Sequence, residues 1–132
     1  MSQLKNEPDR EEPPRGDPVR AVRAYYRFVD TGNIRELAQL FALDALYRRP
    51  GYREIFGRAE LERFYREERV IAEGAHTLSK IISEDREVAV RGVFTGVLRD
   101  GTETSAEFAD FFRVNAAGEF SLRQTFFFVP LV

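Results

Sequence analysis

The spacing of apolar residues in the first half of the chain is helical. Pro18 is a favourable first residue of a helix and Gly32 a favourable residue just past its end, so one helix is predicted between them. Asn33, with Glu36 three residues later, has the pattern of a capping box and predicts a second, short helix. Gly57 precedes a third helical pattern. The apolar residues that carry these patterns are Val19, Val22, Tyr26, Val29, Ile34, Leu37, Ala38, Phe41, Leu61, Phe64 and Tyr65.

After Gly74 apolar and polar residues alternate with period two, which predicts strands. A shorter strand is predicted at 45–49, ahead of Pro50, and turn residues such as Asp100 and Gly101 separate the long segments. Helices followed by strands predict an α+β fold, with three N-terminal helices packed on one face of a curved, mostly antiparallel sheet. The long alternating segments are 75–83, 87–99, 103–115 and 119–129.

The chain has the length and the apolar content of a single domain. It has 132 residues, of which 43% are hydrophobic and 13% aromatic, enough to form a sizeable core. Residues 1–17 combine charges of both signs with three prolines, and we expect a flexible charged tail there. The domain is therefore predicted at 18–132.

Composition excludes several classes of function. The net charge is −2 and the pI about 5.6, so no bulk positive charge attracts nucleic acid. With no cysteine and one histidine, the sequence predicts neither a disulfide, a metal site nor a bound cofactor. No apolar run approaches the ~20 residues of a membrane span, and the N-terminal segment is highly charged, so a cytoplasmic location is expected.

One carboxylate falls among apolar residues. Asp110 has the strand parity of Phe108 and Phe112, which places all three on one face of the third long strand. Burial disfavours the charged form of a carboxyl group, so Asp110 can remain protonated and donate a hydrogen bond to an oxyanion. The alternative is a buried Asp110 that is paired with an arginine or a tyrosine hydroxyl.

Three further polar residues are candidates on the predicted strands. Gln124 has the parity of Phe126 and would bring an amide into the same apolar layer. Arg91 lies on a semi-apolar face, where it can bind an anionic or carbonyl group or pair with an acid. His76, the only histidine, can act as a general base near neutral pH.

Two segments carry a resemblance to a known family. The order of elements, the segment FALDALYRRPGYREIFGRAELERFY and the segment ADFFRVNAAG resemble the nuclear transport factor 2-like superfamily, in particular its SnoaL-like and ketosteroid-isomerase-like branch. The similarity extends over roughly residues 18–130. It implies a cone-shaped pocket between helices and sheet, although this fold hosts isomerases, cyclases, hydrolases and binding modules.

The resemblance implies roles for individual residues. Tyr25 falls at the position of the tyrosine that donates to the oxyanion in ketosteroid isomerases, and Asp110 at that of their protonated aspartic acid. Their catalytic base corresponds to Arg49, which cannot abstract a proton, so His76, Glu54 or another group would have to replace it. The predicted catalytic set is Asp110, Tyr25 and His76, and the predicted substrate-binding set is Tyr47, Arg49, Arg91, Phe108, Phe112 and Gln124.

Three functions follow as hypotheses. The first is a domain that binds a hydrophobic carbonyl or phenolic small molecule, possessing isomerase or cyclase activity if it is an enzyme. The second is a non-catalytic dimeric binding or interaction module, which the absent base favours. The third is an epoxide-hydrolase-like enzyme, in which Arg91 matches the active-site arginine while Val93 and Gln124 replace paired aspartates. A homodimer through the outer face of the sheet is predicted from Phe111, Phe127 and Val129.

Overall fold

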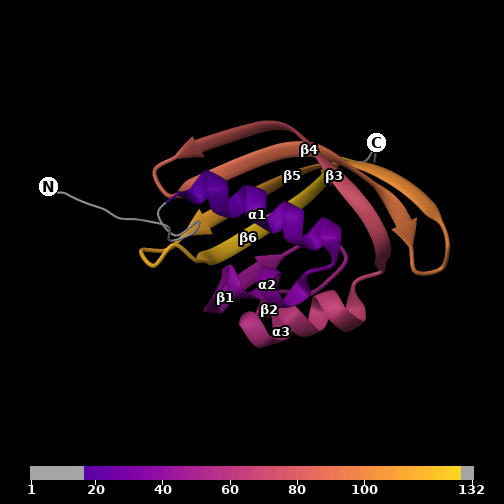
Figure 1. The fold of residues 1–132 in the computed structure, drawn as a ribbon, viewed down its shortest axis with the longest axis horizontal. Helices are drawn as coiled ribbons and strands as arrows, with labels where there is room; N and C mark the ends of the chain where they lie inside the picture. The colour runs from indigo at the N-terminus through magenta and orange to yellow at the C-terminus, as the bar shows by residue number, and fades with distance from the viewer. Residues whose placement is uncertain (1–16, 129–132) are drawn as a thin grey trace, which may run out of the picture.

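The computed structural model describes residues 17–128 and has the predicted α+β architecture (Figure 1). All of the predicted tail except Asp17 lies outside these residues, as does Val129. The helices are α1 (Pro18–Thr31), α2 (Ile34–Gln39) and α3 (Arg58–Arg63), which continues into a π-helical turn at Phe64–Glu68. The strands are β1 (Phe41–Arg48), β2 (Ile55–Phe56), β3 (Ile71–Glu84), β4 (Glu87–Leu98), β5 (Glu103–Val114) and β6 (Phe120–Phe128).

The ends of α1 follow from its sequence. The Asp17 carboxylate accepts hydrogen bonds from two backbone N–H groups of the first turn, ahead of Pro18. At the other end Gly32 takes a left-handed conformation with φ 78°, as residues after a helix often do. The capping box predicted at Asn33 is absent, because the Asn33 side chain turns back and donates to the Thr31 hydroxyl at 2.9 Å.

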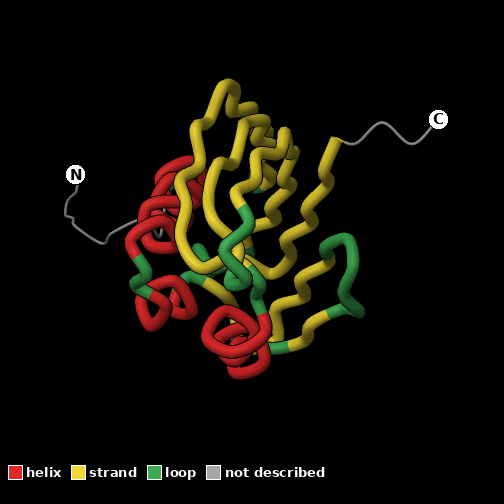
Figure 2. Tube along the Cα trace, turned by 90° about the vertical axis from the view of Figure 1, so that its right-hand side faces the viewer, coloured by secondary structure: helices red, strands yellow, loops and turns green. Residues whose placement is uncertain are grey.

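The six strands form one curved sheet in the order β2-β1-β6-β5-β4-β3. Every pairing is antiparallel except that of β1 with β6, which is parallel. The helices lie on one side of the sheet (Figure 2). Among the described residues, no helix has the length and hydropathy that a membrane crossing requires.

Strand β1 begins four residues earlier than predicted, at Phe41 instead of Ala45. Phe41 was expected in the apolar stripe of the second helix, but it pairs with Phe120 of β6 and is fully buried. Its strand conformation depends on a partner at the far end of the sequence, which no local pattern reveals.

Side-chain directions on β6 differ from those predicted. Phe120 and Val114 are partners, as are Leu122 and Arg113, so Ser121 is an extra residue that reverses the alternation. Consequently Gln124 does not lie in the inner apolar layer. Phe126 and Phe128, predicted to point inward, are exposed, whereas Arg123, Thr125 and Phe127 are buried or half-buried beneath the helices.

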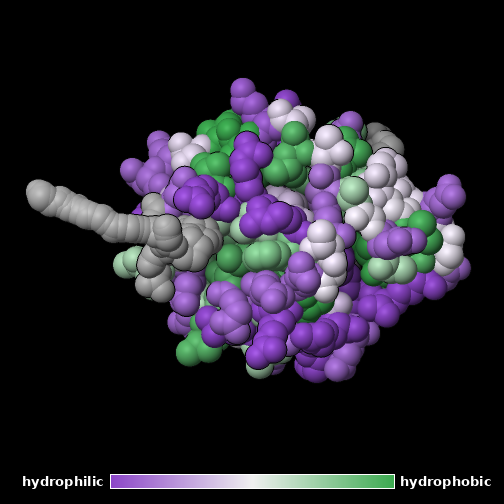
Figure 3. All heavy atoms as spheres, viewed as in Figure 1, coloured by the Kyte–Doolittle hydropathy of each residue, from purple (hydrophilic) through white to green (hydrophobic). Residues whose placement is uncertain are grey.

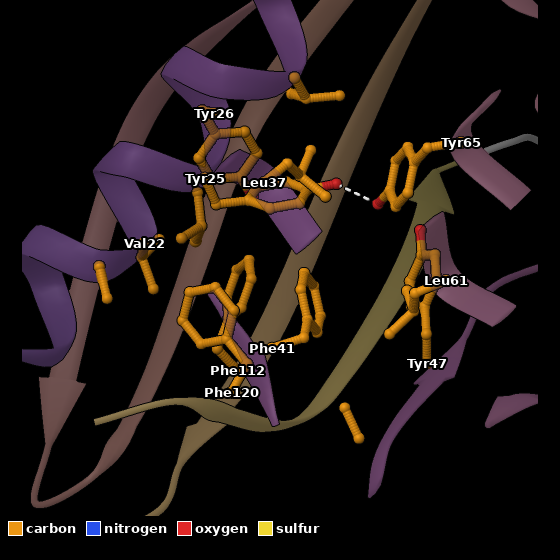
Figure 4. Packing of buried hydrophobic residues seen from close by; sticks show 14 of the residues in the cluster. Val22, Tyr25, Tyr26, Leu37, Phe41, Tyr47, Leu61, Tyr65, Phe112 and Phe120 are labelled. Atoms are coloured by element: carbon orange, nitrogen blue, oxygen red, sulfur yellow. Dashed lines mark hydrogen bonds between the residues drawn. The ribbon is translucent and has the colours of Figure 1, made fainter. Parts of the chain in front are cut away.

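Aromatic side chains dominate the core between α1 and the sheet (Figure 4). Phe112 of β5 packs edge to face on Tyr25 of α1, with ring centroids 5.6 Å apart. Phe108 lies over Gly92 of β4, where an added Cβ would come within 3.0 Å of the Phe108 ring and 2.4 Å of the Thr77 carbonyl oxygen. The absence of a side chain at Gly92 therefore gives this ring its place on the inner face of the sheet.

Candidate functional site

Asp110 is fully buried on the inner face of β5 and is bonded within the protein. Its carboxylate accepts hydrogen bonds from the Thr125 hydroxyl at 2.5 Å, from Arg123 Nη2 at 2.8 Å, and from the Tyr26 hydroxyl. Buried carboxylates are stable when their charge is paired and their lone pairs are occupied. The structure therefore places Asp110 as a paired acceptor, the alternative that the residue pattern left open.

Arg123 connects Asp110 to the tyrosines. The strand alternation predicted for β6 did not place it on the inner face. The residue is 4% exposed, and its guanidinium donates through Nη1 to the Tyr65 hydroxyl at 2.9 Å. The guanidinium lies between the rings of Tyr25 and Tyr47, with its central carbon 4.4 and 4.6 Å from the two centroids. Burial by itself lowers the pKa of Arg123, but the Asp110 carboxylate raises the pKa well above its ordinary value. Arg123 is therefore a permanent buried cation.

The hydroxyl groups of Tyr25 and Tyr65 are 2.5 Å apart (Figure 4). Burial raises the pKa of Tyr65 to about 12 and that of Tyr25 well above its ordinary value, so both are neutral phenols at physiological pH. Because Arg123 donates to Tyr65, Tyr65 can donate to Tyr25 and leave the Tyr25 proton for another acceptor.

A second chain of donors runs toward Asp110. Thr125 uses its single proton on Asp110, so the hydroxyl of Tyr47 donates to Thr125 at 3.1 Å. Arg49 Nη1 in turn lies 3.4 Å from the Tyr47 hydroxyl. Tyr47 and Thr125 thus belong to the buried hydrogen-bond network around Asp110.

His76 on β3 is paired with an acid from another element. Its ring Nδ1 lies 2.6 Å from an Asp30 carboxylate oxygen, and its backbone N–H donates to the other oxygen at 2.9 Å. The imidazole is packed among Tyr26, Phe94 and Phe108, at ring distances of 5.1, 4.9 and 5.4 Å. Asp30 was missed by the sequence analysis because it lies 46 positions away, in the last turn of α1.

The inner cavity, as we call it, lies between the helices and the concave face of the sheet. It has a volume of about 30 Å³. It brings together four of the predicted residues, namely Tyr25, His76, Arg49 and Phe108, with Arg123 of the buried network. The other residues that line it are Arg69, Ile71, Phe94, Thr125 and Phe127. Asp110 is not in its wall.

The outer groove, of about 440 Å³, lies at the end of β1 and shares Arg49 and Thr125 with the inner cavity. Glu54, named as an alternative base, lines this groove and pairs with Arg48 at 3.0 Å. The remaining residues of its wall are Arg48, Pro50, Tyr52, Arg53, Gln124 and Phe126. Arg49 and Thr125 thus form the boundary between the two spaces.

The structure does not bring every predicted residue to the inner cavity. Arg91 is exposed on the outer face of β4, because the inner face there carries Val90 and Gly92. Gln124 faces the outer groove, and Phe112 is a core residue beneath Tyr25. Within residues 17–128, no group of three His, Asp or Glu side chains is arranged to hold a metal ion.

Solved structures with the same fold are similar to this chain at low sequence identity. One is a hypothetical protein of ketosteroid-isomerase-like fold from Catenulispora acidiphila, in complex with trimethylamine. It is 21% identical to this chain, and the alignment covers 80% of this chain and 83% of that protein, with a TM-score of 0.71. SalBIII, an epoxide hydrolase/cyclase-like enzyme of pyran ring formation in salinomycin, is 17% identical over 86% and 92% of the two chains, with a TM-score of 0.74. An epoxide hydrolase of M. tuberculosis is 17% identical over 88% and 86%, with a TM-score of 0.74.

At these identities the structural likeness shows the fold alone. Curated proteins gave no match. The sequence model of the SnoaL-like domain, however, matches residues 22–122, which include most of α1, the positions of Tyr25, Tyr65 and Asp110, and the start of β6. The chain belongs to the SnoaL-like domain family.

Proposed function

We propose that this domain binds a carbonyl-bearing small molecule and catalyses proton transfer next to its carbonyl group, as in an isomerisation or an aldol-type cyclisation. The observation that carries the proposal is that His76, paired with Asp30, and Tyr25 line the same inner cavity. A base and a hydrogen-bond donor around one small space are the two groups that enolisation needs.

Tyr25 would stabilise the developing enolate oxygen. The Arg123 guanidinium polarises Tyr65, Tyr65 donates to Tyr25, and Tyr25 donates to the ligand. Because a raised pKa keeps Tyr25 neutral, its proton stays available as a donor at ordinary pH. Asp110 holds the Arg123 guanidinium at the start of this series of hydrogen bonds. It is therefore a positioning residue.

His76 would be the base that the resemblance lacked at Arg49. With its Nδ1–H donated to Asp30, the neutral imidazole keeps Nε2 as a proton acceptor, and the Asp30 carboxylate stabilises the imidazolium that forms. The proton taken from the carbon next to the carbonyl returns to a different carbon in an isomerisation. In an aldol-type closure the enolate carbon instead attacks a second carbonyl.

The size of the two spaces suggests how a ligand would lie. The inner cavity admits only the reacting group, and the outer groove, at about 440 Å³, falls in the ~300–1,000 Å³ range of small-molecule sites. The hydrophobic part of the ligand would rest on Tyr52 in the outer groove.

The test is exchange of the protons next to the carbonyl of candidate ketones in D₂O, followed by NMR. We expect exchange with the native chain to fall at least ~100-fold in His76→Gln and in Tyr25→Phe, the usual size of an acid–base or oxyanion contribution. Arg91→Gln, on the outer face, is the matched control and should exchange like the native chain. Equal rates in all four proteins would overturn the catalytic proposal.

A second candidate is the non-catalytic binding module. The small inner cavity and the complete pairing of Asp110 favour it, since a ligand meets neither a large chamber nor a free carboxyl group. The epoxide-hydrolase alternative has less support, because Arg91 lies on the outer face and Asp110 is bonded within the protein.

For either function we propose a homodimer through the outer face of the sheet. Phe111, Phe126 and Phe128 lie exposed there, and the rings of Phe111 and Phe126 touch edge to face at 5.8 Å. The opposite side, with α1 and α3, presents mostly hydrophilic side chains (Figure 3). Phe126 and Phe128 thus replace Phe127 in the predicted contact.

A further inference from the structure

Three arginine side chains reach the inner cavity, and each holds one buried N–H group without an acceptor. Among the described residues, Nε of Arg49, of Arg69 and of Arg123 has no hydrogen-bond partner. An Nε–H group points along the guanidinium plane, so an aromatic ring stacked on that plane does not accept its hydrogen bond. Within the described part of the chain, three arginines that each retain an unpaired donor therefore line one cavity.

Two of the three arginines at the cavity have no paired carboxylate in the part of the chain that the structure describes. Asp110 offsets Arg123, but within residues 17–128 no carboxylate pairs with Arg49 or Arg69. The Arg49 guanidinium is instead held by aromatic rings, 5.3 Å from Tyr52, 5.4 Å from Phe127 and 5.7 Å from Phe64. Partly buried cations without an anion are costly, so this arrangement favours an anionic ligand.

The volume of the inner cavity limits which anions can bind in it. At ~10–15 Å³ for each water-sized group, about 30 Å³ accepts two or three heavy atoms. A carboxylate has three, lies in a plane, and accepts side-by-side hydrogen bonds from a guanidinium. A tetrahedral phosphate group is larger and does not match this space.

We propose that the ligand of this domain is an organic acid whose carboxylate binds at the inner cavity between Arg49 and Arg69. The inference rests on the proposed function, from which it takes the inner cavity as the binding site. A carboxylate of three heavy atoms fills that cavity and leaves no room there for a reacting carbonyl group, so the inference belongs with the binding-module candidate. Arg49 lines both spaces, so the remainder of the acid extends past it into the outer groove, onto Tyr52.

The test compares acids with their neutral amides. Benzoate and benzamide, and acetate and acetamide, are titrated into the full chain by calorimetry at pH 7 and at an ionic strength fixed with sodium chloride. We expect saturable binding of at least one acid and at least tenfold weaker binding of its amide. An acid that binds no better than its amide, or no better than chloride, would overturn the inference.

Variants then locate the site. Arg49→Gln and Arg69→Gln should each weaken acid binding at least tenfold, whereas Arg91→Gln on the outer face should leave it unchanged. The comparison of acid with amide on the native chain needs no variant, so poor folding of Arg49→Gln or Arg69→Gln cannot hide the result. Unchanged binding in both folded variants would also overturn the inference.

The two proposals fail separately. Acid binding without any proton exchange would retain the carboxylate site and remove the catalytic proposal. Proton exchange of uncharged ketones, together with equal binding of acids and amides, would retain catalysis and remove the carboxylate site.

Discussion

Arg123 and Asp110 are opposite charges that have almost no contact with water. A buried pair of this kind adds little net stability compared with apolar residues of the same shape, whereas loss of one partner costs about 3–5 kcal/mol. The main effect of the ion pair is therefore to fix the position of the Arg123 guanidinium. The pair holds the guanidinium against the ring of Tyr25 and the hydroxyl of Tyr65, where the guanidinium orders the hydrogen bond between the two tyrosines.

Those buried tyrosines make the stability of the domain sensitive to alkali. Burial raises the pKa of Tyr65 to about 12, above the ordinary value near 10, so the unfolded chain releases this proton first as pH rises. The free energy of unfolding should then fall between pH 10 and 12, by up to ~1.4 kcal/mol per pH unit for this one group. Urea unfolding from pH 9 to 11.5 measures it.

Tyr65→Phe is the matched variant for that measurement, because it removes the titrating group and keeps the ring. Its loss of stability with rising pH should be less steep than that of the native chain. Identical slopes would show that Tyr65 does not contribute to the alkaline transition.

Single residues could be predicted where the strand alternation is unbroken. The parity of β5 placed Asp110 with Phe108 and Phe112 on the inner face, as observed. On β6 the extra residue Ser121 reversed the alternation, so Gln124 was predicted at the inner face and Arg123 was missed. A bulge of one residue depends on the neighbouring strand and leaves no local signal.

At the scale of elements, β4 depends on a residue that has no side chain. A Cβ at position 92 would meet the Thr77 carbonyl oxygen at 2.4 Å and the Phe108 ring at 3.0 Å. We expect Gly92→Ala to lower the free energy of unfolding by about 1–3 kcal/mol, as overpacking of a core does. Denaturant unfolding measures the change.

The control for that substitution is Thr95→Ala on the same strand, where the side chain is exposed. It should change stability by less than ~0.5 kcal/mol. Equal stability of Gly92→Ala and this control would contradict the close approach of the Phe108 ring to position 92.

Elements whose signals are local were predictable. Pro18 and Gly32 define α1, and the long strands match the alternating segments to within a few residues. The start of β1 could not be predicted, because the strand conformation of its first residues depends on parallel pairing with β6. The His76–Asp30 pair was missed for the same reason, since two elements far apart in sequence supply it.

At the scale of the whole molecule, the exposed aromatic residues on the outer face predict a second copy as partner. Phe126→Glu places a charge in the proposed contact and should convert a dimer to a monomer in light scattering. Arg35→Glu, on an exposed position of α2, should leave the mass unchanged. A native chain that is monomeric at all concentrations would contradict the proposed dimer.

The parallel pairing of β1 with β6 also dictates when the site can form during synthesis. Tyr26 and its acceptor Asp110 are 84 positions apart, and the guanidinium that pairs with Asp110 comes from β6, the last described strand of the fold. At ~5–20 residues per second, the ribosome adds β6 about one to four seconds after Asp110. Until β6 joins the sheet, Asp110 lacks its cation and β1 lacks one of its two neighbours, so the interior cannot close. The binding site and the hydrophobic core are therefore completed together, in a single late event of folding.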